Sequence, residues 1–240
     1  MVTILSPHLD DAAYSLTLML RRLASKERHI EIVNCFTQSS YSVQGGETTS
    51  GTVSRHRLYE DKAFLQCVGK SVHARYLELP DTSLRPEYSD LGDAFHSRAL
   101  DEAERNVLVR LVALLRSLPS SGAAGGPVVV PIAYGNHIDH RLVRAAAEEL
   151  YEAERLIYYE DLPYSAKAAR RKIRQRLDRS HCEAMLCVAD AESLRFKDMA
   201  IACYSSQLTP EHRELIGQRA AQLGGERVWL STPSYGALWA

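Results

Sequence analysis

The stretch Val2-Thr3-Ile4-Leu5-Ser6-Pro7-His8-Leu9-Asp10-Asp11 begins with apolar and β-branched residues and ends in a cluster of polar ones. The apolar run Val2–Leu5 is typical of a strand that is buried on both faces. One imidazole and two carboxylates therefore follow directly after a predicted strand. In open α/β sheets, the carboxyl ends of the strands are where ligands bind.

A second part of the sequence repeats this arrangement. The apolar run at residues 128–132 is followed by His137-Ile138-Asp139-His140, which brings two imidazoles and a carboxylate to the end of another predicted strand. When the strands at 2–5 and 128–132 lie side by side, both polar clusters meet in the crevice at the carboxyl ends of the strands. The sequence therefore predicts one site that is assembled from distant parts of the chain.

Strand and helix patterns alternate around these two clusters, in the order β-α-β-α-β-α-β-α-β. This order predicts an α/β fold, a single-domain, Rossmann-like, three-layer α/β/α arrangement with a mostly parallel sheet, formed by residues 1–240. The chain has no G-x-G-x-x-G after its first strand and no G-x-x-x-x-G-K-[ST], so nucleotide binding is not indicated. The predicted strands are residues 2–5, 30–36, 75–79, 128–132 and 156–159, and the predicted helices are residues 14–23, 54–68, 100–118 and 142–151.

The composition is that of an ordinary soluble enzyme. The 240 residues are 45% hydrophobic and carry 30 acidic and 29 basic side chains, so the chain can bury a core without attracting nucleic acid or anionic membranes. The sequence contains no run of 18 apolar residues, which is about the length needed to span a bilayer. We therefore expect neither a nucleic-acid nor a membrane partner, while a homo-oligomer stays open. Five scattered cysteines and no secretory signal predict reduced thiols in a cytoplasmic protein.

Histidine and aspartate without cysteine form the donor set of a catalytic zinc site rather than a structural one, and such a site has three protein ligands and one open position. Asp10 then stays free to accept a proton, and His137 stays off the metal with Asp139 as the partner that fixes its tautomer. In an alternative without metal, the aspartates cap helices and the histidines are loop residues. This alternative could account for one such cluster, but it accounts poorly for two clusters that both follow predicted strands. We predict that the metal ligands are His8, Asp11 and His140.

At these residues the sequence resembles the PIG-L/LmbE-like superfamily of zinc-dependent de-N-acetylases. That family has an (H/P)-x-D-D motif after its first strand and a later H-x-D-H motif. It also has an R-x-x-E helix that ends in glycine, and an aspartate at a strand end. With two further segments common in its bacterial members, the resemblance spans nearly the whole chain. The matching segments are residues 6–11, 57–69, 79–81, 135–140, 159–164 and 197–207.

The resemblance implies one zinc ion per chain on the same three ligands, with other divalent ions as alternatives. It implies that Asp10 is the general base. His137 would stabilise the oxyanion or protonate the leaving amine, with Asp139 orienting it. Arg57 and Asp81 match positions that face substrate in sugar-acting members.

Three further features concern the substrate. Many members have a glutamate after the paired aspartates, where this chain has Ala12, so substrate contacts of those members do not transfer directly. Tyr134 is a candidate for the pocket lining and for substrate binding. The polar segment 37–52 is too long for a structural turn and leaves the same end of the sheet, which makes it a candidate substrate loop.

The predicted function is removal of an N-acetyl or other N-acyl group from a small molecule that contains an amino sugar, or from a natural-product intermediate. An alternative uses the same metal site for hydrolysis or cyclisation of a non-sugar amide in secondary metabolism. A remote alternative is a non-haem iron oxygenase, because His8, Asp10 and His140 also fit a 2-His-1-carboxylate triad. A second remote alternative is a domain that has lost catalysis and serves only in binding.

Overall fold

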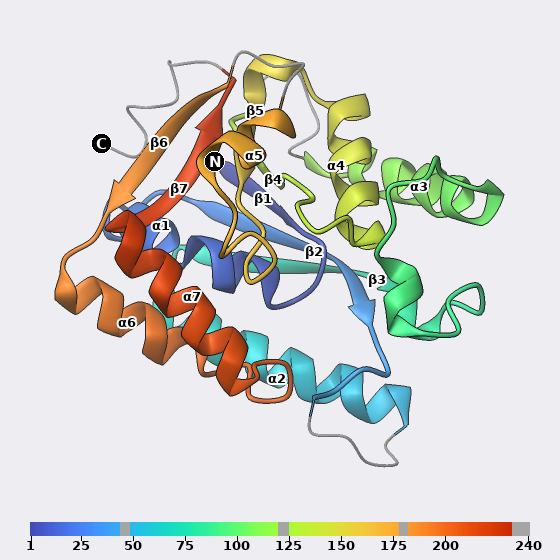
Figure 1. Cartoon of the computed structure of the whole chain (residues 1–240), viewed down its shortest axis with the longest axis horizontal. Coiled ribbons are helices and arrows are strands. Elements are labelled where there is room, and N and C mark those ends of the chain that lie inside the picture. The colour runs from blue at the N-terminus through green and yellow to red at the C-terminus, as the bar shows by residue number, and fades with distance from the viewer. Residues whose placement is uncertain (44–48, 120–124, 178–181, 232–240) are drawn as a thin grey trace.

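The computed structural model describes residues 1–43, 49–119, 125–177 and 182–231. Its strands form one sheet in the order β3-β2-β1-β4-β5-β7-β6 (Figure 1). The strands are β1 (Val2–Ser6), β2 (Ile30–Gln38), β3 (Val72–Pro80), β4 (Val128–Pro131), β5 (Leu156–Tyr159), β6 (Glu183–Val188) and β7 (Gly225–Leu230).

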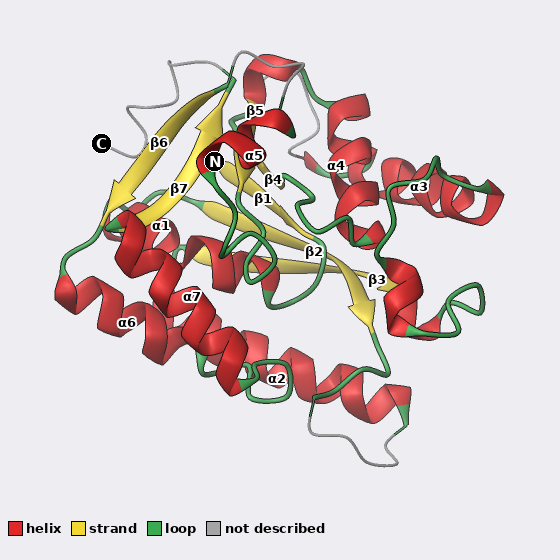
Figure 2. Cartoon of the chain, viewed as in Figure 1, coloured by secondary structure: helices red, strands yellow, loops and turns green. Residues whose placement is uncertain are grey.

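Helices cover both faces of this sheet (Figure 2), which confirms the predicted three-layer α/β/α fold. In β4, Val128 and Val130 pack into the core on one face and Val129 packs into the core on the other, as alternation along a strand requires. Within the described residues, every helix is too short or too polar to cross a bilayer. One face carries α1 (Asp11–Ser25), α2 (Ser50–Val68), α6 (Ala191–Ile201) and α7 (Pro210–Leu223), and the other carries α3 (Glu102–Arg116), α4 (Ile138–Leu150) and α5 (Arg170–Gln175).

The order of the strands reverses at β1. This strand pairs in parallel with β2 on one side and with β4 on the other, while the chain runs from β1 through β2 and β3 before it crosses back to β4. The predicted neighbourhood of the strands at 2–5 and 128–132 is therefore confirmed. A crevice opens at such a reversal, and it lies at the carboxyl ends of both strands.

Two strands in the C-terminal part are not predicted from the sequence. β7 lies between β5 and β6 and is antiparallel to both. It contains Glu226 and Arg227, whose charges are buried against Lys197 and Glu160, so it lacks the apolar run of a buried strand. β6 is one of the two edge strands, and only Cys187 in it is buried, so its hydrophobic pattern is equally weak.

A buried ion pair ties α1 to this C-terminal part. Lys197 Nζ lies 2.5 Å from Oε1 of Glu226 and donates to the carbonyl of Tyr14 at 2.6 Å. Oε2 of Glu226 accepts from the backbone N–H groups of Leu18 and Met19, each at 3.0 Å. The pair thus holds the middle of the helix whose first residue belongs to the N-terminal polar cluster.

Candidate active site

The turn between β1 and α1 presents the first polar cluster. The Ser6 hydroxyl donates to the carbonyl of His8 at 2.6 Å and accepts from the backbone N–H of Ala12 at 3.1 Å. The Asp11 carboxylate accepts from the backbone N–H of His8 at 2.8 Å. These bonds close the turn and bring the His8 and Asp11 side chains together. Ala12 packs into the apolar core, so its side chain does not reach the site.

Left-handed backbone between β4 and α4 presents the second cluster. Ala133, Gly135 and Asn136 have φ angles of 60°, 93° and 66°, a region that glycine and asparagine tolerate best. Gly135 also leaves room for a neighbour, because a Cβ there would lie 3.0 Å from the Cβ of Tyr164. The chain then enters α4, with His137 as its N-terminal cap. The H-x-D-H motif therefore lies at the start of a helix rather than in a loop.

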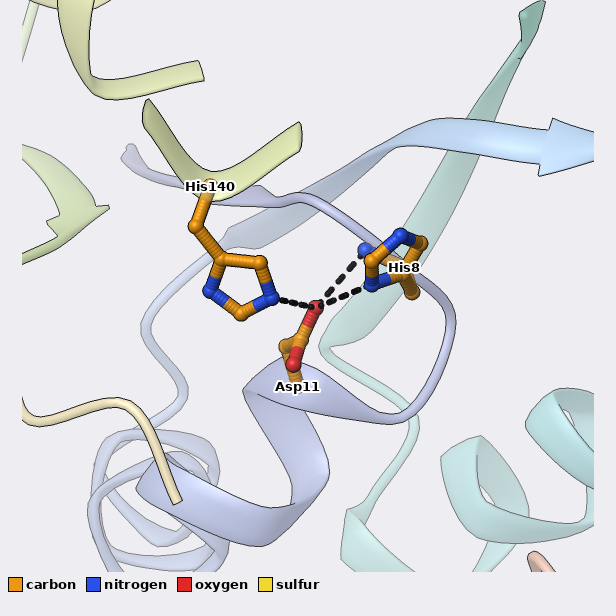
Figure 3. A group of neighbouring side chains, drawn as sticks. All are labelled: His8, Asp11 and His140. Carbon is orange, nitrogen blue, oxygen red and sulfur yellow. Dashed lines mark hydrogen bonds and ion pairs between the residues drawn. The ribbon is translucent and has the colours of Figure 1, made fainter. Parts of the chain in front are cut away.

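The side chains of His8, Asp11 and His140 converge on one point (Figure 3). Oδ2 of Asp11 lies 3.1 Å from Nδ1 of His8 and 3.3 Å from Nε2 of His140. Ligands of a tetrahedral zinc ion, each about 2.0–2.1 Å from the metal, lie about 3.3 Å from one another. Nε2 of His140 is buried and has no hydrogen-bond partner among the described residues. The donor set and its spacing therefore fit a zinc ion.

Each of the two imidazoles has a carboxylate behind it. Nε2 of His8 lies 2.9 Å from Oδ2 of Asp139, and Nδ1 of His140 lies 2.7 Å from Oδ1 of Asp161. Such carboxylates fix the tautomer and orientation of a metal-binding histidine. Both rings therefore turn their other nitrogen toward Asp11. Asp161 is not among the site residues predicted from the sequence, although it follows β5 by two residues and so occupies the same strand-end position as the other site residues.

The predicted pairing of the Asp139 carboxylate with His137 is wrong. That carboxylate contacts His8, Arg85 and the backbone N–H of Thr82. Instead, the backbone N–H of Asp139 donates to Nδ1 of His137 at 3.2 Å, because His137 caps the helix that begins there. Burial lowers the pKa of His137 to about 3, so the ring is neutral and its proton is on Nε2. His137 is therefore a hydrogen-bond donor on the wall of the cavity.

A second set of donor atoms, from His8, His137 and Asp139, also lies within 4.8 Å of one another. It shares His8 with the first set. Its carboxylate is already bonded to the Arg85 guanidinium and to His8. The first set is the better fit for an ion, because it includes the buried imidazole nitrogen that has no hydrogen-bond partner among the described residues.

Asp10, Arg57 and Asp81 form a row of charges beside the converging residues. The Arg57 guanidinium lies 3.6 Å from Asp10 and 3.5 Å from Asp81. Burial raises the pKa of Asp10 more than the charge of Arg57 lowers it, which makes Asp10 a better proton acceptor. Asp10 is not among the described donors that converge with His8, so the geometry does not favour the iron triad that would use it.

These side chains border a cavity of about 300 Å³. Tyr41, Phe95 and Tyr164 stand around it with 36%, 41% and 36% of their surface exposed, so its outer wall is aromatic. Tyr41 belongs to the predicted substrate loop, and residues 44–48 of that loop lie outside the described residues. The polar residues that line the cavity include His8, Asp10, Asp11, Arg57, Asp81 and His137, together with Thr82, Ser83, Gln207 and His212.

Tyr134, predicted to line the pocket and bind substrate, is not among the residues that line this cavity. Its side chain packs against the core beneath α3 and α4, while its backbone N–H donates to Asp161 at 3.0 Å. Tyr164 and Tyr14 line the cavity instead. The Tyr14 hydroxyl is buried with no hydrogen-bond partner among the described residues. Tyr14 is not predicted as a site residue from the sequence, because it continues the apolar pattern of its helix.

We expect the affinity of the site for zinc to rise with pH. Burial alone would lower the pKa of His8, but its hydrogen bonds to Asp11 and Asp139 outweigh burial and raise the pKa to about 10. Below that pH an ion must displace a proton from His8. Burial is likewise outweighed at His140, where the carboxylates of Asp11 and Asp161 raise the pKa, so affinity should increase at least about tenfold per pH unit between roughly pH 6 and pH 9. Titration calorimetry in buffers of different ionisation enthalpy counts the protons released, and an affinity independent of pH would contradict this prediction.

The fold and the site define an α/β protein with a candidate catalytic metal centre where its strand order reverses. The profile of the PIG-L family, GlcNAc-PI de-N-acetylase, matches residues 3–151. The chain belongs to this family, which confirms the resemblance of its motifs. The match contains β1 to β4 and α4, and thus both polar clusters.

The individual proteins to which the chain is similar include deacetylases. The chain is 27% identical over 232 residues to 2'-N-acetylparomamine deacetylase of Streptomyces fradiae, which covers 94% of this chain and 80% of that protein. A deacetylase from the biosynthesis pathway of teicoplanin is similar in structure, with a TM-score of 0.74, 22% identity and coverage of 95% and 96%. The zinc-inhibited form of teicoplanin deacetylase Orf2 gives a TM-score of 0.70 at 22% identity, with the same coverage. At these identities the two structures show a shared fold.

Proposed function

We propose that the protein is a metal-dependent N-deacetylase, with zinc as its preferred ion, that acts on a small molecule containing an N-acetylated amino sugar in secondary metabolism. The observation that carries this proposal is the convergence of His8, Asp11 and His140 beside a cavity that Asp10 and His137 also line. Membership of the family supports deacetylation. The similarity to 2'-N-acetylparomamine deacetylase supports an amino-sugar substrate.

The residues around the cavity have complementary roles in amide hydrolysis. A bound zinc ion supplies Lewis acidity, which makes water more acidic and polarises a carbonyl oxygen. Asp10 accepts the proton of the attacking water, since burial raises its pKa. His137 donates from Nε2 to the oxyanion that develops on the acyl carbon. Asp10 then passes its proton to the departing amine, and the products are a free amine and acetate.

Arg57 and Asp81 are suited to hold the sugar in place. Both are buried, with 3% and 4% of their surface exposed, yet both line the cavity. A guanidinium donates hydrogen bonds and a carboxylate accepts them, so the pair fits neighbouring hydroxyl groups of a sugar ring. We also propose that residues 1–240 act as one domain, because all strands in the described part of the chain join one sheet.

We expect the zinc-loaded protein to release acetate from N-acetylated amino sugars. The metal-free protein is given one equivalent of zinc. An excess is avoided because teicoplanin deacetylase Orf2, which is similar in structure, has a zinc-inhibited form. The panel contains 2'-N-acetylparomamine, simple N-acetylglucosamine glycosides and N-acetyl amino acids. Acetate and new primary amine are measured together, because hydrolysis must release them in equal amounts. The metal-free protein is the control.

The same panel separates the alternatives. Hydrolysis of N-acetyl amino acids without hydrolysis of any sugar would contradict the amino-sugar proposal and favour the non-sugar amide. Amine release that does not depend on metal would contradict the proposed role of the ion. Stoichiometric zinc without turnover of any panel member would favour a binding domain.

A further inference from the structure

The Asp139 carboxylate uses its two oxygens for two different partners. Oδ2 lies 2.9 Å from Nε2 of His8 and accepts from the backbone N–H of Thr82 at 3.3 Å. Oδ1 accepts from the guanidinium of Arg85. Asp139 has no exposed surface, so water cannot replace either partner. The orientation of this carboxylate therefore depends on Arg85 at one end and determines the His8 ring at the other.

Arg85 is itself held rigidly. It ends the short 3₁₀ turn Thr82–Leu84, and 5% of its surface is exposed. Its guanidinium lies 5.4 Å from the ring centroid of Phe36 and 5.1 Å from that of Tyr88, which are the distances of cation–π contacts. Phe36 in turn lies beside the His8 ring, with 6.4 Å between their centroids. Arg85 thus packs directly behind the candidate metal centre.

The fold alone does not account for this arginine. Its Nε and Nη1 atoms are buried and have no hydrogen-bond partner among the described residues, which costs free energy. A buried ion pair generally stabilises a fold no better than apolar side chains of the same volume. Asp139 is the one carboxylate that pairs with this buried guanidinium in the described part of the chain, so the role of Arg85 is better explained by the role of Asp139.

We propose that Arg85 is a positioning residue of the metal centre, which holds Asp139 so that Asp139 fixes the His8 ring with Nδ1 facing Asp11 and the ion. This inference rests on the proposed zinc site. It assigns Arg85 no contact with substrate. Removal of Arg85 frees the carboxylate to rotate, and the His8 ring then loses its fixed orientation toward the other two ligands.

The test measures zinc affinity without any substrate. Affinities of Arg85→Met, Arg85→Lys and Asp139→Asn are measured by competition with a chromophoric chelator, and the visible spectrum of each cobalt-loaded protein reports the ligand geometry. We expect Arg85→Met to weaken zinc binding about 10–100-fold, the usual effect of losing an outer partner. Arg85→Lys should recover part of this loss, because it keeps the charge but not the planar fork.

Two controls separate positioning from a general loss of stability. Arg155 is a matched arginine, 7% exposed and 5.3 Å from the ring of Tyr151, but it donates to the carbonyl of Gly126. Arg155→Met should leave zinc affinity and the cobalt spectrum unchanged. Arg85→Met combined with Asp139→Asn should bind zinc no more weakly than Asp139→Asn alone, because both changes break the same link.

The outcomes are distinguishable. A wild-type protein that binds no zinc would overturn the proposed function and this inference together. A wild-type protein that binds zinc, with Arg85→Met binding it equally well, would overturn the inference alone. Additive losses in the double variant would also overturn it, since Arg85 would then not act through Asp139. If Arg85→Met does not fold, Arg85→Lys decides, and unchanged zinc affinity and cobalt spectrum in that variant would reject the inference.

Discussion

Replacing His140 with alanine is expected to remove stoichiometric zinc and, with it, all measurable deacetylation. The change deletes one of three proposed ligands and leaves Asp161, almost completely buried and 2.7 Å from the lost nitrogen, without its imidazole partner. Loss of a direct ligand should exceed the ~10–100-fold weakening that follows loss of an outer partner. Mass spectrometry of the dialysed protein measures the metal, and circular dichroism checks that the variant is folded.

His137→Ala is the matched control for this experiment. Its ring lies 5.3 Å from that of His140, centroid to centroid, and the two residues share the start of α4. We propose that His137 stays off the metal, so His137→Ala should keep zinc and lose turnover. If His140→Ala kept one zinc per chain, or if His137→Ala lost it, the assignment of ligands would have to be exchanged between these two residues.

Asp10→Asn is expected to reduce turnover about 10²–10⁴-fold, the usual contribution of general acid–base catalysis, while zinc content stays normal. Asparagine keeps the size of the side chain but cannot accept a proton at neutral pH. Arg57, 3.6 Å away, would retain Asp81 as a charged neighbour, so the fold should be preserved. Steady-state rates of acetate release, measured at one equivalent of zinc, test this prediction.

Asp11→Asn separates the two adjacent aspartates. Oδ2 of Asp11 faces both imidazoles, so its replacement should weaken zinc itself, because a neutral amide oxygen is a poorer ligand than a carboxylate. Added zinc should partly restore Asp11→Asn and leave Asp10→Asn inactive. The reverse pattern of rescue would mean that the base and the ligand are exchanged, and a triad containing Asp10 would regain support.

β1, β4 and β5 could be predicted from the sequence because they are buried apolar runs. β3 is a half-exposed edge strand at residues 72–80, and the prediction covers only residues 75–79 of it. The C-terminal strands could not, because a charged residue such as Glu226 reads as exposed unless its buried partner is known. Lys197, which neutralises it, lies 29 residues earlier in the sequence. A sequence pattern reports spacing along the chain, whereas the pairing of Lys197 with Glu226 exists only in the folded molecule.

The same limit applies to the site. Strand-end positions predict where His8, Asp11 and His140 meet, and the structure brings their donor atoms together. The contacts of these ligands with the carboxylates of Asp139 and Asp161 depend on the side-chain rotamers, which a sequence motif does not specify. Asp139 therefore turns out to face His8 rather than its close neighbour in the motif. Arg85 belongs to none of the sequence motifs, and its contact with Asp139 is what identifies it as a candidate positioning residue.

The place of β7 in the sheet bears on how the protein is made. On the ribosome, residues 1–150, from β1 to the end of α4, are synthesised before β7, so a nascent chain contains every proposed zinc ligand well before β7 emerges. Glu226, whose carboxylate binds the middle of α1, lies 208 residues after Leu18. Until β7 is synthesised, β5 lacks its antiparallel neighbour, and the backbone N–H groups of Leu18 and Met19 in α1 lack the Glu226 carboxylate as acceptor. We expect stalled chains that end before β7 to bind chaperones and to hold zinc weakly, so that firm metal retention marks a completed polypeptide.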